Sequence, residues 1–162
     1  MQVVVPYVAG MLHPDTRAAV AASGLPWQLC EIDRGDRTGY ARLLARRWRY
    51  RETFVNVEHD IVPTRAQLDE IAHCGHDWCV FEYDDGLSPG SPKLGLARFG
   101  KQLLCDQPGL AERALRVSAY DDRYRDWTDV DVRLVRELSI LGYRPAVHGP
   151  PVRHLNGGAQ VA

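Results

Sequence analysis

Apolar and polar segments alternate along the N-terminal part of the chain in a pattern that predicts strands and helices in turn. Residues 3–8 form a short, β-branched and continuously apolar run, which is typical of a strand covered on both faces by helices. Residues 13–24 have a proline near their start, strong helix formers inside and a glycine at their end, which predicts a helix. Residues 25–32 predict a second strand. This β-α-β order indicates two parallel strands joined by a right-handed crossover.

The central segment continues the alternation. Residues 40–51 place apolar side chains on one face of a helix and arginines on the other. An apolar strand at 53–57, a capped helix at 64–73 and a further strand at 78–83 follow. The next ten residues, 84–93, are rich in glycine, proline and serine and predict a long loop. Strands that alternate with helices are typical of an α/β fold.

The C-terminal part has a weaker pattern. Residues 95–104 and 110–117 predict helical or mixed segments. Thr128 is a candidate N-cap for a convincing helix that Gly142 closes. Residues 144–156 carry three prolines and alternate poorly, which favours an extended edge segment or a loop.

Composition fits one compact domain. The chain has 162 residues, of which 45% are hydrophobic and 25% are charged, and these fractions are ordinary for a globular domain with a real core. We therefore predict a single Rossmann-like α/β domain over residues 1–156, with a mixed, mainly parallel sheet flanked by helices. Residues 157–162 are expected to form a flexible tail.

The charge balance and the lack of long apolar runs exclude some classes of function. Twenty Lys and Arg against twenty-one Asp and Glu give a net charge of −1, so no global field attracts nucleic acid or an acidic membrane. No apolar run approaches the ~20 residues that a spanning helix needs, and no basic segment precedes the first strand. These features predict a cytoplasmic protein without a membrane span.

Four cysteines are too few for a disulfide scaffold in a chain of this length, so reduced thiols are expected. Residues 73–79 (HCGHDWC) bring cysteines and histidines to short spacing, and such residues can bind zinc. A structural zinc site usually shows a second ligand pair at matching spacing, and the sequence has none. Cys79 also fits the apolar pattern of a strand, where a buried thiol is ordinary. The sequence therefore favours packing over zinc binding here.

Candidate chemistry follows the apolar strand at 53–57. Glu58, His59 and Asp60 come directly after it, at the carboxyl end of a strand, where open α/β sheets place their ligands. Carboxylate oxygens are suitable ligands for a divalent cation. If strand alternation continues, His59 points to the opposite face from the two carboxylates and serves packing or hydrogen bonding.

These parts, in this order, resemble the nucleotide-sugar glycosyltransferases of the A-type fold. In that family an acidic triplet of the DxD type closes a central strand and holds a divalent cation on the sugar-nucleotide diphosphate; the counterpart here is Glu58-x-Asp60, with glutamate at the first position. Residues 92–99 (PKLGLARF) are similar to the glycine-containing segment beside the sugar and the acceptor. Residues 127–131 (WTDVD) resemble the acidic motif at a helix start, and 147–154 (VHGPPVRH) resemble the C-terminal histidine segment.

The resemblance implies a cation site and a base. Glu58 and Asp60 would bind Mn²⁺ or Mg²⁺ together with His154, to which His148 is the alternative. Asp129 or Asp131 would deprotonate the acceptor, with Asp129 first by its place in the motif. Acidic residues in the first turn of a helix are also favoured by the helix dipole, whatever their function.

The resemblance also implies a nucleotide site at the ends of the first two strands. Pro6 and Tyr7 end the first strand, where the family holds the base and ribose, and Asp33 follows the second. Arg42, with Arg46 one helical turn later, would reach the phosphates, although a solvated basic face explains the same pair of residues.

The sequence thus predicts a metal-dependent glycosyltransferase of the hexosyltransferase type that uses a nucleoside-diphosphate sugar, with a UDP-sugar favoured, as its donor. Two alternatives stay open: a metal-dependent phosphoesterase or nuclease built on the same ligands, and a non-catalytic nucleotide-sugar-binding domain of the same fold. The acceptor is open among protein, glycan, lipid and modified nucleic acid, and so is assembly into a homo-oligomer. The chain is short for this family, so either the acceptor site is minimal or a partner supplies it.

Overall fold

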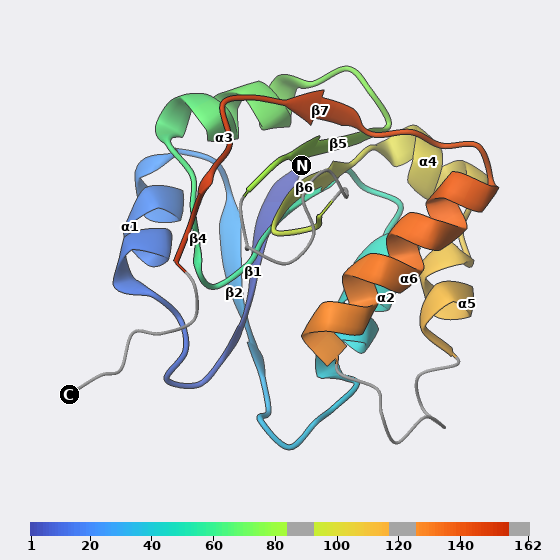
Figure 1. The fold of residues 1–162 in the computed structure, drawn as a ribbon, viewed down its shortest axis with the longest axis horizontal. Helices are drawn as coiled ribbons and strands as arrows, with labels where there is room; N and C mark the ends of the chain where they lie inside the picture. The colour runs from blue at the N-terminus through green and yellow to red at the C-terminus, as the bar shows by residue number, and fades with distance from the viewer. Residues whose placement is uncertain (84–92, 117–125, 156–162) are drawn as a thin grey trace.

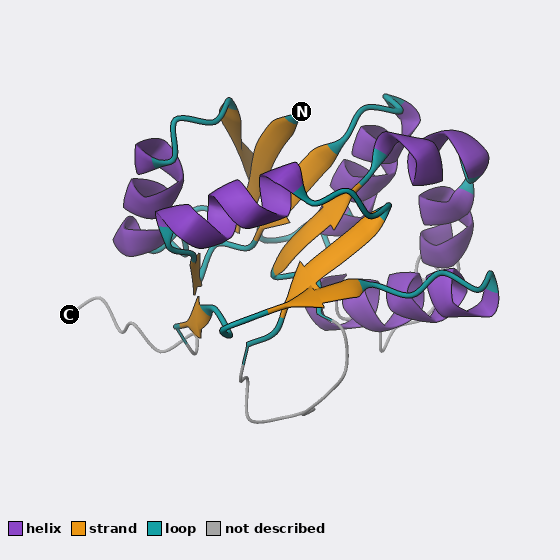
Figure 2. Ribbon diagram, turned by 90° about the horizontal axis from the view of Figure 1, so that it is seen from above, coloured by secondary structure: helices purple, strands orange, loops and turns teal. Residues whose placement is uncertain are grey.

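A six-stranded sheet runs through the centre of the computed structural model, which describes residues 1–83, 93–116 and 126–155 (Figures 1 and 2). Neighbouring strands in the sheet are parallel except around one strand, which runs antiparallel to both of its neighbours. The predicted α/β fold with a mixed, mainly parallel sheet is therefore confirmed. From one edge to the other the strands are β2 (Trp27–Ile32), β1 (Gln2–Val8), β3 (Phe54–Val57), the antiparallel β6 (Leu96–Phe99), β5 (Trp78–Phe81) and β7 (Ala146–His148).

Helices cover both faces of this sheet, as Figures 1 and 2 show. One face carries α1 (Pro14–Ala22) and α3 (Arg65–His73); the other carries α2 (Gly39–Arg49), α4 (Lys101–Asp106), α5 (Leu110–Arg116) and α6 (Asp126–Ile140). Strand β1 supplies both apolar layers, because its successive side chains point to opposite faces. Val3 and Val5 pack in the layer of α1 and α3, whereas Val4 packs in the layer of α2 and α6. Burial on both faces explains the continuous apolar run at residues 3–8 of β1.

Pro6 lies inside β1, although a proline cannot donate a ladder hydrogen bond. Strand β1 pairs with β2 from Val3 to Val8, but with β3 only from Gln2 to Val4. Pro6 therefore lies beyond the end of the β1–β3 ladder, and that ladder loses no hydrogen bond to it.

Local signals set the bounds of two helices. Thr64 caps α3 in a capping box, in which its side chain accepts a hydrogen bond from the Gln67 backbone and the Gln67 side chain accepts one from the Thr64 backbone. Gly142 closes α6 with a positive φ of 84°. The predicted cap at Thr128 is wrong: α6 begins at Asp126, so Thr128 lies within its first turn.

The C-terminal segment returns across the sheet as two short strands. After β7, the chain forms β8 (Arg153–His154), which pairs antiparallel with β4 (Ile61–Val62). Three hydrogen bonds hold this C-terminal segment in place. The Gln67 side chain donates to the Pro150 carbonyl at 2.9 Å, the Val152 N–H to the Glu82 carbonyl at 2.8 Å, and the Leu155 N–H to the Asp60 carbonyl at 2.9 Å. The expected extended segment is thus tied to both α3 and the residues after β3.

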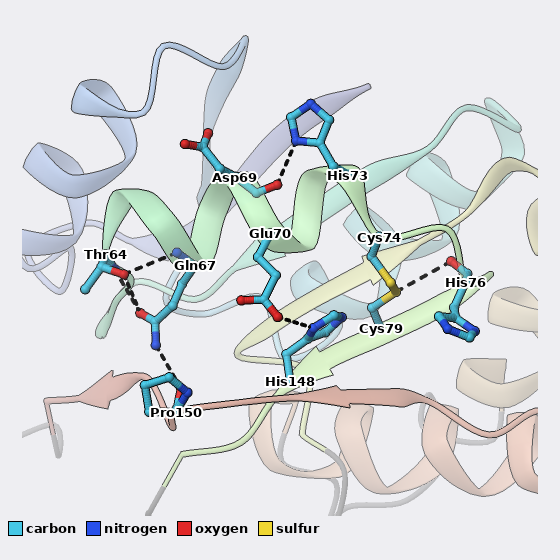
Figure 3. Close-up of polar contacts among 10 residues, drawn as sticks. All are labelled: Thr64, Gln67, Asp69, Glu70, His73, Cys74, His76, Cys79, His148 and Pro150. Carbon is cyan, nitrogen blue, oxygen red and sulfur yellow. Dashed lines mark hydrogen bonds and ion pairs between the residues drawn. A yellow bond between two sulfur atoms is a disulfide. The ribbon is translucent and has the colours of Figure 1, made fainter.

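Cys74 and Cys79 form a disulfide between the end of α3 and β5 (Figure 3). The expectation of reduced thiols is wrong for this pair, because the short turn between α3 and β5 brings the two sulfur atoms together. Cys30 and Cys105 are free.

Among the described residues, no helix has the length and apolar character that a membrane crossing needs. Most of the predicted loop at 84–93 and the predicted tail at 157–162 lie outside the described residues.

Candidate functional site

The acidic triplet lies at the carboxyl edge of the sheet. Strand β3 ends at Val57, and Glu58, His59 and Asp60 form the turn that leads into β4. Because β6 runs antiparallel to β3, the residues that precede β6 lie at the same edge. The Glu58 N–H donates to the Gly95 carbonyl at 2.9 Å. The triplet is thus at the edge where α/β sheets bind ligands, next to the segment that precedes β6.

Asp60 and His154 meet through the small β4–β8 sheet. Ile61, directly after Asp60, pairs with His154 itself. This register brings His154 Nε2 to 3.3 Å from Asp60 Oδ2, and both side chains are mostly buried. His148, the alternative cation ligand, lies elsewhere: it is in β7 and its Nδ1 is 2.6 Å from Glu70 Oε1. The structure therefore brings His154, rather than His148, to the triplet.

Glu58 is a buried carboxylate among other acids. The Tyr40 hydroxyl donates a hydrogen bond to Glu58 Oε1 at 2.9 Å. Burial raises the pKa of Glu58 well above its ordinary value, and the negative charges of Asp131 and Asp60 raise it further, while the hydrogen bond from Tyr40 acts against the rise. A bound cation would offset this repulsion between carboxylates.

Helix α6 contributes Asp131 to the site. Its Oδ2 accepts the Leu94 N–H at 3.1 Å, and its charge acts on both Glu58 and Tyr40. Asp129 is half-buried on the same helix, and residues two positions apart on a helix point in nearly opposite directions. The structure thus places Asp131 beside the triplet, although the motif ranked Asp129 first.

Tyr40 and Asn56 form a buried polar support that the sequence did not indicate as functional. Asn56 Nδ2 donates to the Tyr40 hydroxyl at 2.9 Å and to the Leu94 carbonyl at 2.8 Å, and both side chains are fully buried. Burial and the charges of Glu58 and Asp131 raise the pKa of Tyr40, which keeps its hydroxyl protonated and able to donate. A signal was available, since an amide inside the apolar strand 53–57 needs hydrogen-bond partners.

Lys93 and Tyr83 border the site on the side of His154. The buried Lys93 donates from Nζ to the Tyr83 carbonyl at 3.3 Å and lies 4.9 Å from the centre of the Tyr83 ring. The same ring packs against His154, with 4.9 Å between ring centres. Gly95 permits this packing, because a Cβ there would lie 2.5 Å from the Tyr83 ring and 3.0 Å from the Ile61 side chain.

His59 lies between the two carboxylates of the triplet, in the turn that follows β3. The strand ends at Val57, so the alternation of faces does not extend to the triplet. His59 is buried; burial lowers its pKa, and the charges of Asp60 and His154 also act on it. That His59 points away from the two carboxylates stays a prediction.

Two of the four predicted nucleotide-binding residues line one cavity. Asp33 and Arg42 border a space of about 630 Å³ between β2 and α2. Asp33 Oδ1 accepts the Gly35 N–H at 2.6 Å, and Arg42 forms an ion pair with Asp36, so both side chains also order the loop between these elements. This cavity adjoins α2, the helix that supplies Tyr40 to Glu58.

Tyr7 and Pro6 lie on β1 beside this region. The Tyr7 hydroxyl donates to Glu31 Oε2 at 2.8 Å, and Glu31 lines the cavity. The hydrogen bond to Glu31 raises the pKa of Tyr7. Pro6 is buried in β1 and is not among the residues that line the cavity.

Comparisons with known proteins show the fold. No protein-family model matches the sequence, and no curated protein matches it either. Over 95% of this chain and 84% of the other, the structure is similar to that of A197 from STIV, with a TM-score of 0.58 and 10% sequence identity. It is also similar to a glycosyltransferase involved in the glycosylation of the major capsid of PBCV-1, over 92% of this chain and 81% of the other, with a TM-score of 0.53 and 11% identity. The chain therefore has a glycosyltransferase-like fold.

Proposed function

We propose that this protein is a metal-dependent glycosyltransferase that transfers a sugar from a nucleoside-diphosphate sugar, with a UDP-sugar favoured, to an acceptor hydroxyl. The observation that carries the proposal is the meeting of Asp60 and His154, from distant segments, at the sheet edge that also holds Glu58 and Asp131. The glycosyltransferase-like fold supports it.

The donor set at this edge fits a divalent cation. Glu58 and Asp60 offer carboxylate oxygens and His154 an imidazole nitrogen, which suit Mn²⁺ or Mg²⁺. Burial and the negative charges of Asp131 and Asp60 raise the pKa of Glu58, and a bound cation would act against both effects. When bound, the cation would neutralise the charge that develops on the diphosphate leaving group. Among the described residues, only Cys74, Cys79 and His148 bring three ligand atoms within 4.8 Å of one another, so joint ligation by Glu58, Asp60 and His154 requires their side chains to move closer.

Asp131 is the better-placed base of the two aspartates on α6. Its carboxylate lies beside Glu58 and is oriented by the Leu94 N–H. Leu94 belongs to the segment that resembles the sugar- and acceptor-binding segment of the family. In the proposed reaction, the Asp131 carboxylate accepts the proton of the acceptor hydroxyl. Asp129 remains the alternative base on the same helix.

The cavity between β2 and α2 is a candidate nucleoside site. Its volume of about 630 Å³ is within the range of small-molecule pockets. Asp33 offers a carboxylate to the ribose or to the base edge, and Arg42 offers a guanidinium to a phosphate. Tyr7 borders this site through its hydrogen bond to Glu31.

Calorimetry with matched variants tests the proposal. Titration of UDP and of GDP into the protein, with and without Mn²⁺, should show Mn²⁺-dependent binding that Asp60→Ala abolishes. Asp69→Ala removes an exposed carboxylate of α3 that lies outside the site, and it should bind as the wild type does. Unchanged affinity in Asp60→Ala would contradict the proposed cation site.

Turnover assays separate the proposal from its alternatives. Release of UDP from a UDP-sugar in the presence of Mn²⁺ supports a transferase. The assay does not need the natural acceptor, because water can take the place of the acceptor hydroxyl. Nucleotide binding without any turnover of a panel of donors and acceptors favours a non-catalytic binding domain. Hydrolysis of a simple phosphodiester, without use of a sugar donor, favours a phosphoesterase.

A further inference from the structure

Three potential metal ligands from three separate elements meet on the face of the sheet covered by α3. Cys74 lies at the end of α3, Cys79 in β5 and His148 in β7 (Figure 3). One ligand atom of each lies within 4.8 Å of those of the other two. Both cysteines are buried, and the His148 side chain is 17% exposed. The third ligand is far from the cysteines in sequence, and the parallel pairing of β7 with β5 brings it in.

The His148 ring is fixed in the orientation that a metal ligand needs. Its Nδ1 lies 2.6 Å from Glu70 Oε1, and the ring stacks on Phe81 at 5.2 Å between ring centres. An ionised carboxylate can only accept a hydrogen bond, so Nδ1 carries a proton and Nε2 is the ring nitrogen that can bind a metal. Nε2 is buried and has no hydrogen-bond partner among the described residues. Figure 3 shows the ring between Glu70 and the sulfur atoms.

We propose that the chain, once Cys74 and Cys79 are reduced, binds one Zn²⁺ through these two thiolates and His148 Nε2. Two thiolates and an imidazole are a donor set that selects zinc among the common divalent ions. Glu70 orients the histidine from the second coordination sphere, as carboxylates do at many zinc–histidine sites. Each thiol loses one proton as its Zn–S bond forms, no electron is transferred, and the two thiolate charges balance the cation. Water fills the fourth position.

The disulfide in the structure is the oxidised form of the same two ligands. The Cα atoms of Cys74 and Cys79 lie 7.0 Å apart, slightly beyond the range of about 4.4–6.8 Å that is usual for disulfides. Cys79 Sγ lies 3.5 Å from the His76 carbonyl oxygen, so the reduced thiol has a hydrogen-bond acceptor ready when no metal is bound. Disulfide and zinc are therefore alternative links between the end of α3 and β5, and zinc adds β7 to the link.

The zinc site shares no residue with Glu58, Asp60 and His154. The zinc proposal is therefore independent of the proposed glycosyl transfer. In this proposal the ion acts as a link between elements of the fold. His148 ends β7, and the chain continues from there to β8, which carries His154. Zinc at the cluster would hold this returning segment against α3 and β5, in addition to the hydrogen bond from Gln67 to the Pro150 carbonyl.

Cobalt and zinc titrations of the full chain test the site. The disulfide is first reduced with a phosphine, which takes up the oxygen of water as the two sulfurs gain two electrons and two protons. One equivalent of Co²⁺ should then give sulfur-to-cobalt charge-transfer absorption and the intense visible bands of tetrahedral cobalt, both displaced by Zn²⁺. Absence of the charge-transfer absorption in the reduced wild type overturns the proposal.

Variants identify the ligands. His148→Ala should weaken Zn²⁺ binding by more than a hundredfold, and Glu70→Ala by about 10- to 100-fold. His73→Ala is the matched control, because His73 lies on the same helix and bonds the Asp69 carbonyl instead; its affinity should equal that of the wild type. Asp60→Ala should show the same sulfur-to-cobalt absorption as the wild type, because this absorption reports only on the cysteine ligands. Unchanged affinity in His148→Ala overturns the assignment.

Thiol alkylation of the wild type needs no variant and no assumption about folding of mutants. Zn²⁺ should protect Cys74 and Cys79 of the reduced protein from iodoacetamide. The exposed Cys105 is an internal control that should react at the same rate with and without the metal. Equal alkylation of Cys74 and Cys79 in both conditions contradicts the proposal.

Discussion

His154 Nε2 lies 3.3 Å from Asp60 Oδ2, although the two residues come from segments far apart in the sequence. The pairing of β4 with β8 creates this contact, since His154 is the register partner of the residue that follows Asp60. The Leu155 N–H adds a backbone hydrogen bond to the Asp60 carbonyl at 2.9 Å. A cation site at this edge therefore has one ligand whose position depends on the C-terminal segment.

Tyr40→Phe tests the buried support of Glu58. The variant removes the hydroxyl that donates to Glu58 Oε1 and accepts from Asn56. Loss of a buried hydrogen bond to a carboxylate costs about 1.5–3 kcal/mol, so the free energy of unfolding in urea should fall by that amount, and Mn²⁺ affinity should fall as well. Tyr50→Phe, at an exposed tyrosine, is the control and should change neither quantity. Equal stability of Tyr40→Phe and wild type would show that the hydrogen bond does not form.

The position of the triplet was predictable, whereas its surroundings were not. An apolar strand followed by Glu58 and Asp60 places two carboxylates at a sheet edge by local pattern alone. Selection of Asp131 over Asp129 depends on which face of α6 packs against the segment of Leu94, and the acidic motif does not encode that face. The contact of Tyr40 with Glu58 depends on how α2 packs against β3, which no local pattern encodes.

The cysteine cluster illustrates the same limit. The segment 73–79 offers two sulfur ligands, and the sequence showed no partner for them at a recognisable spacing. The partner, His148, comes from β7, and only the pairing of β7 with β5 identifies it. Long-range strand pairing thus determines both histidine placements, with His148 at the cysteines and His154 at Asp60.

Glu58→Gln tests how much the charge of Glu58 destabilises the fold. The measurement is made in the presence of a chelator, which removes metal ions. The folded-state pKa of Glu58 is raised, so its protonated form stabilises the fold. That stability is fully present below the unfolded pKa, about 4.3 for a glutamate, and is lost as the pH rises through the folded pKa. Glutamine cannot ionise, so the variant should be more stable than the wild type at neutral pH, by about 1.4 kcal/mol for each pH unit between the folded and the unfolded pKa of Glu58.

Urea unfolding of both proteins across the pH range provides the measurement. The stability difference should grow as the pH rises from 4 and then level off, and Glu52→Gln, at an exposed glutamate, should show no such trend. A wild type that is more stable than Glu58→Gln at neutral pH without metal would contradict the described environment of Glu58.

Gly95→Ala tests the close packing between Tyr83 and the segment before β6. The new methyl group would lie 2.5 Å from the Tyr83 ring and 3.0 Å from Ile61, so the ring must shift from its present position against His154 and Lys93. Overpacking of this kind costs about 1–3 kcal/mol, which should lower the thermal midpoint. Gly75→Ala is the control, because a Cβ there meets nothing within 4 Å. Equal midpoints for the two variants would exclude tight packing at Gly95.

The central claim is a cation-dependent nucleotide-sugar site at Glu58, Asp60 and His154, and a thermal-shift panel of nucleotides and nucleotide sugars with and without Mn²⁺ tests it most directly. A ligand at a hundred times its Kd stabilises the folded state by about 2.7 kcal/mol, which raises the midpoint of a chain of this size by about 5–10 °C. The account predicts such a rise for UDP or a UDP-sugar together with Mn²⁺, and its loss in His154→Ala. No shift with any nucleotide, or an equal shift in the presence of a chelator, would contradict it.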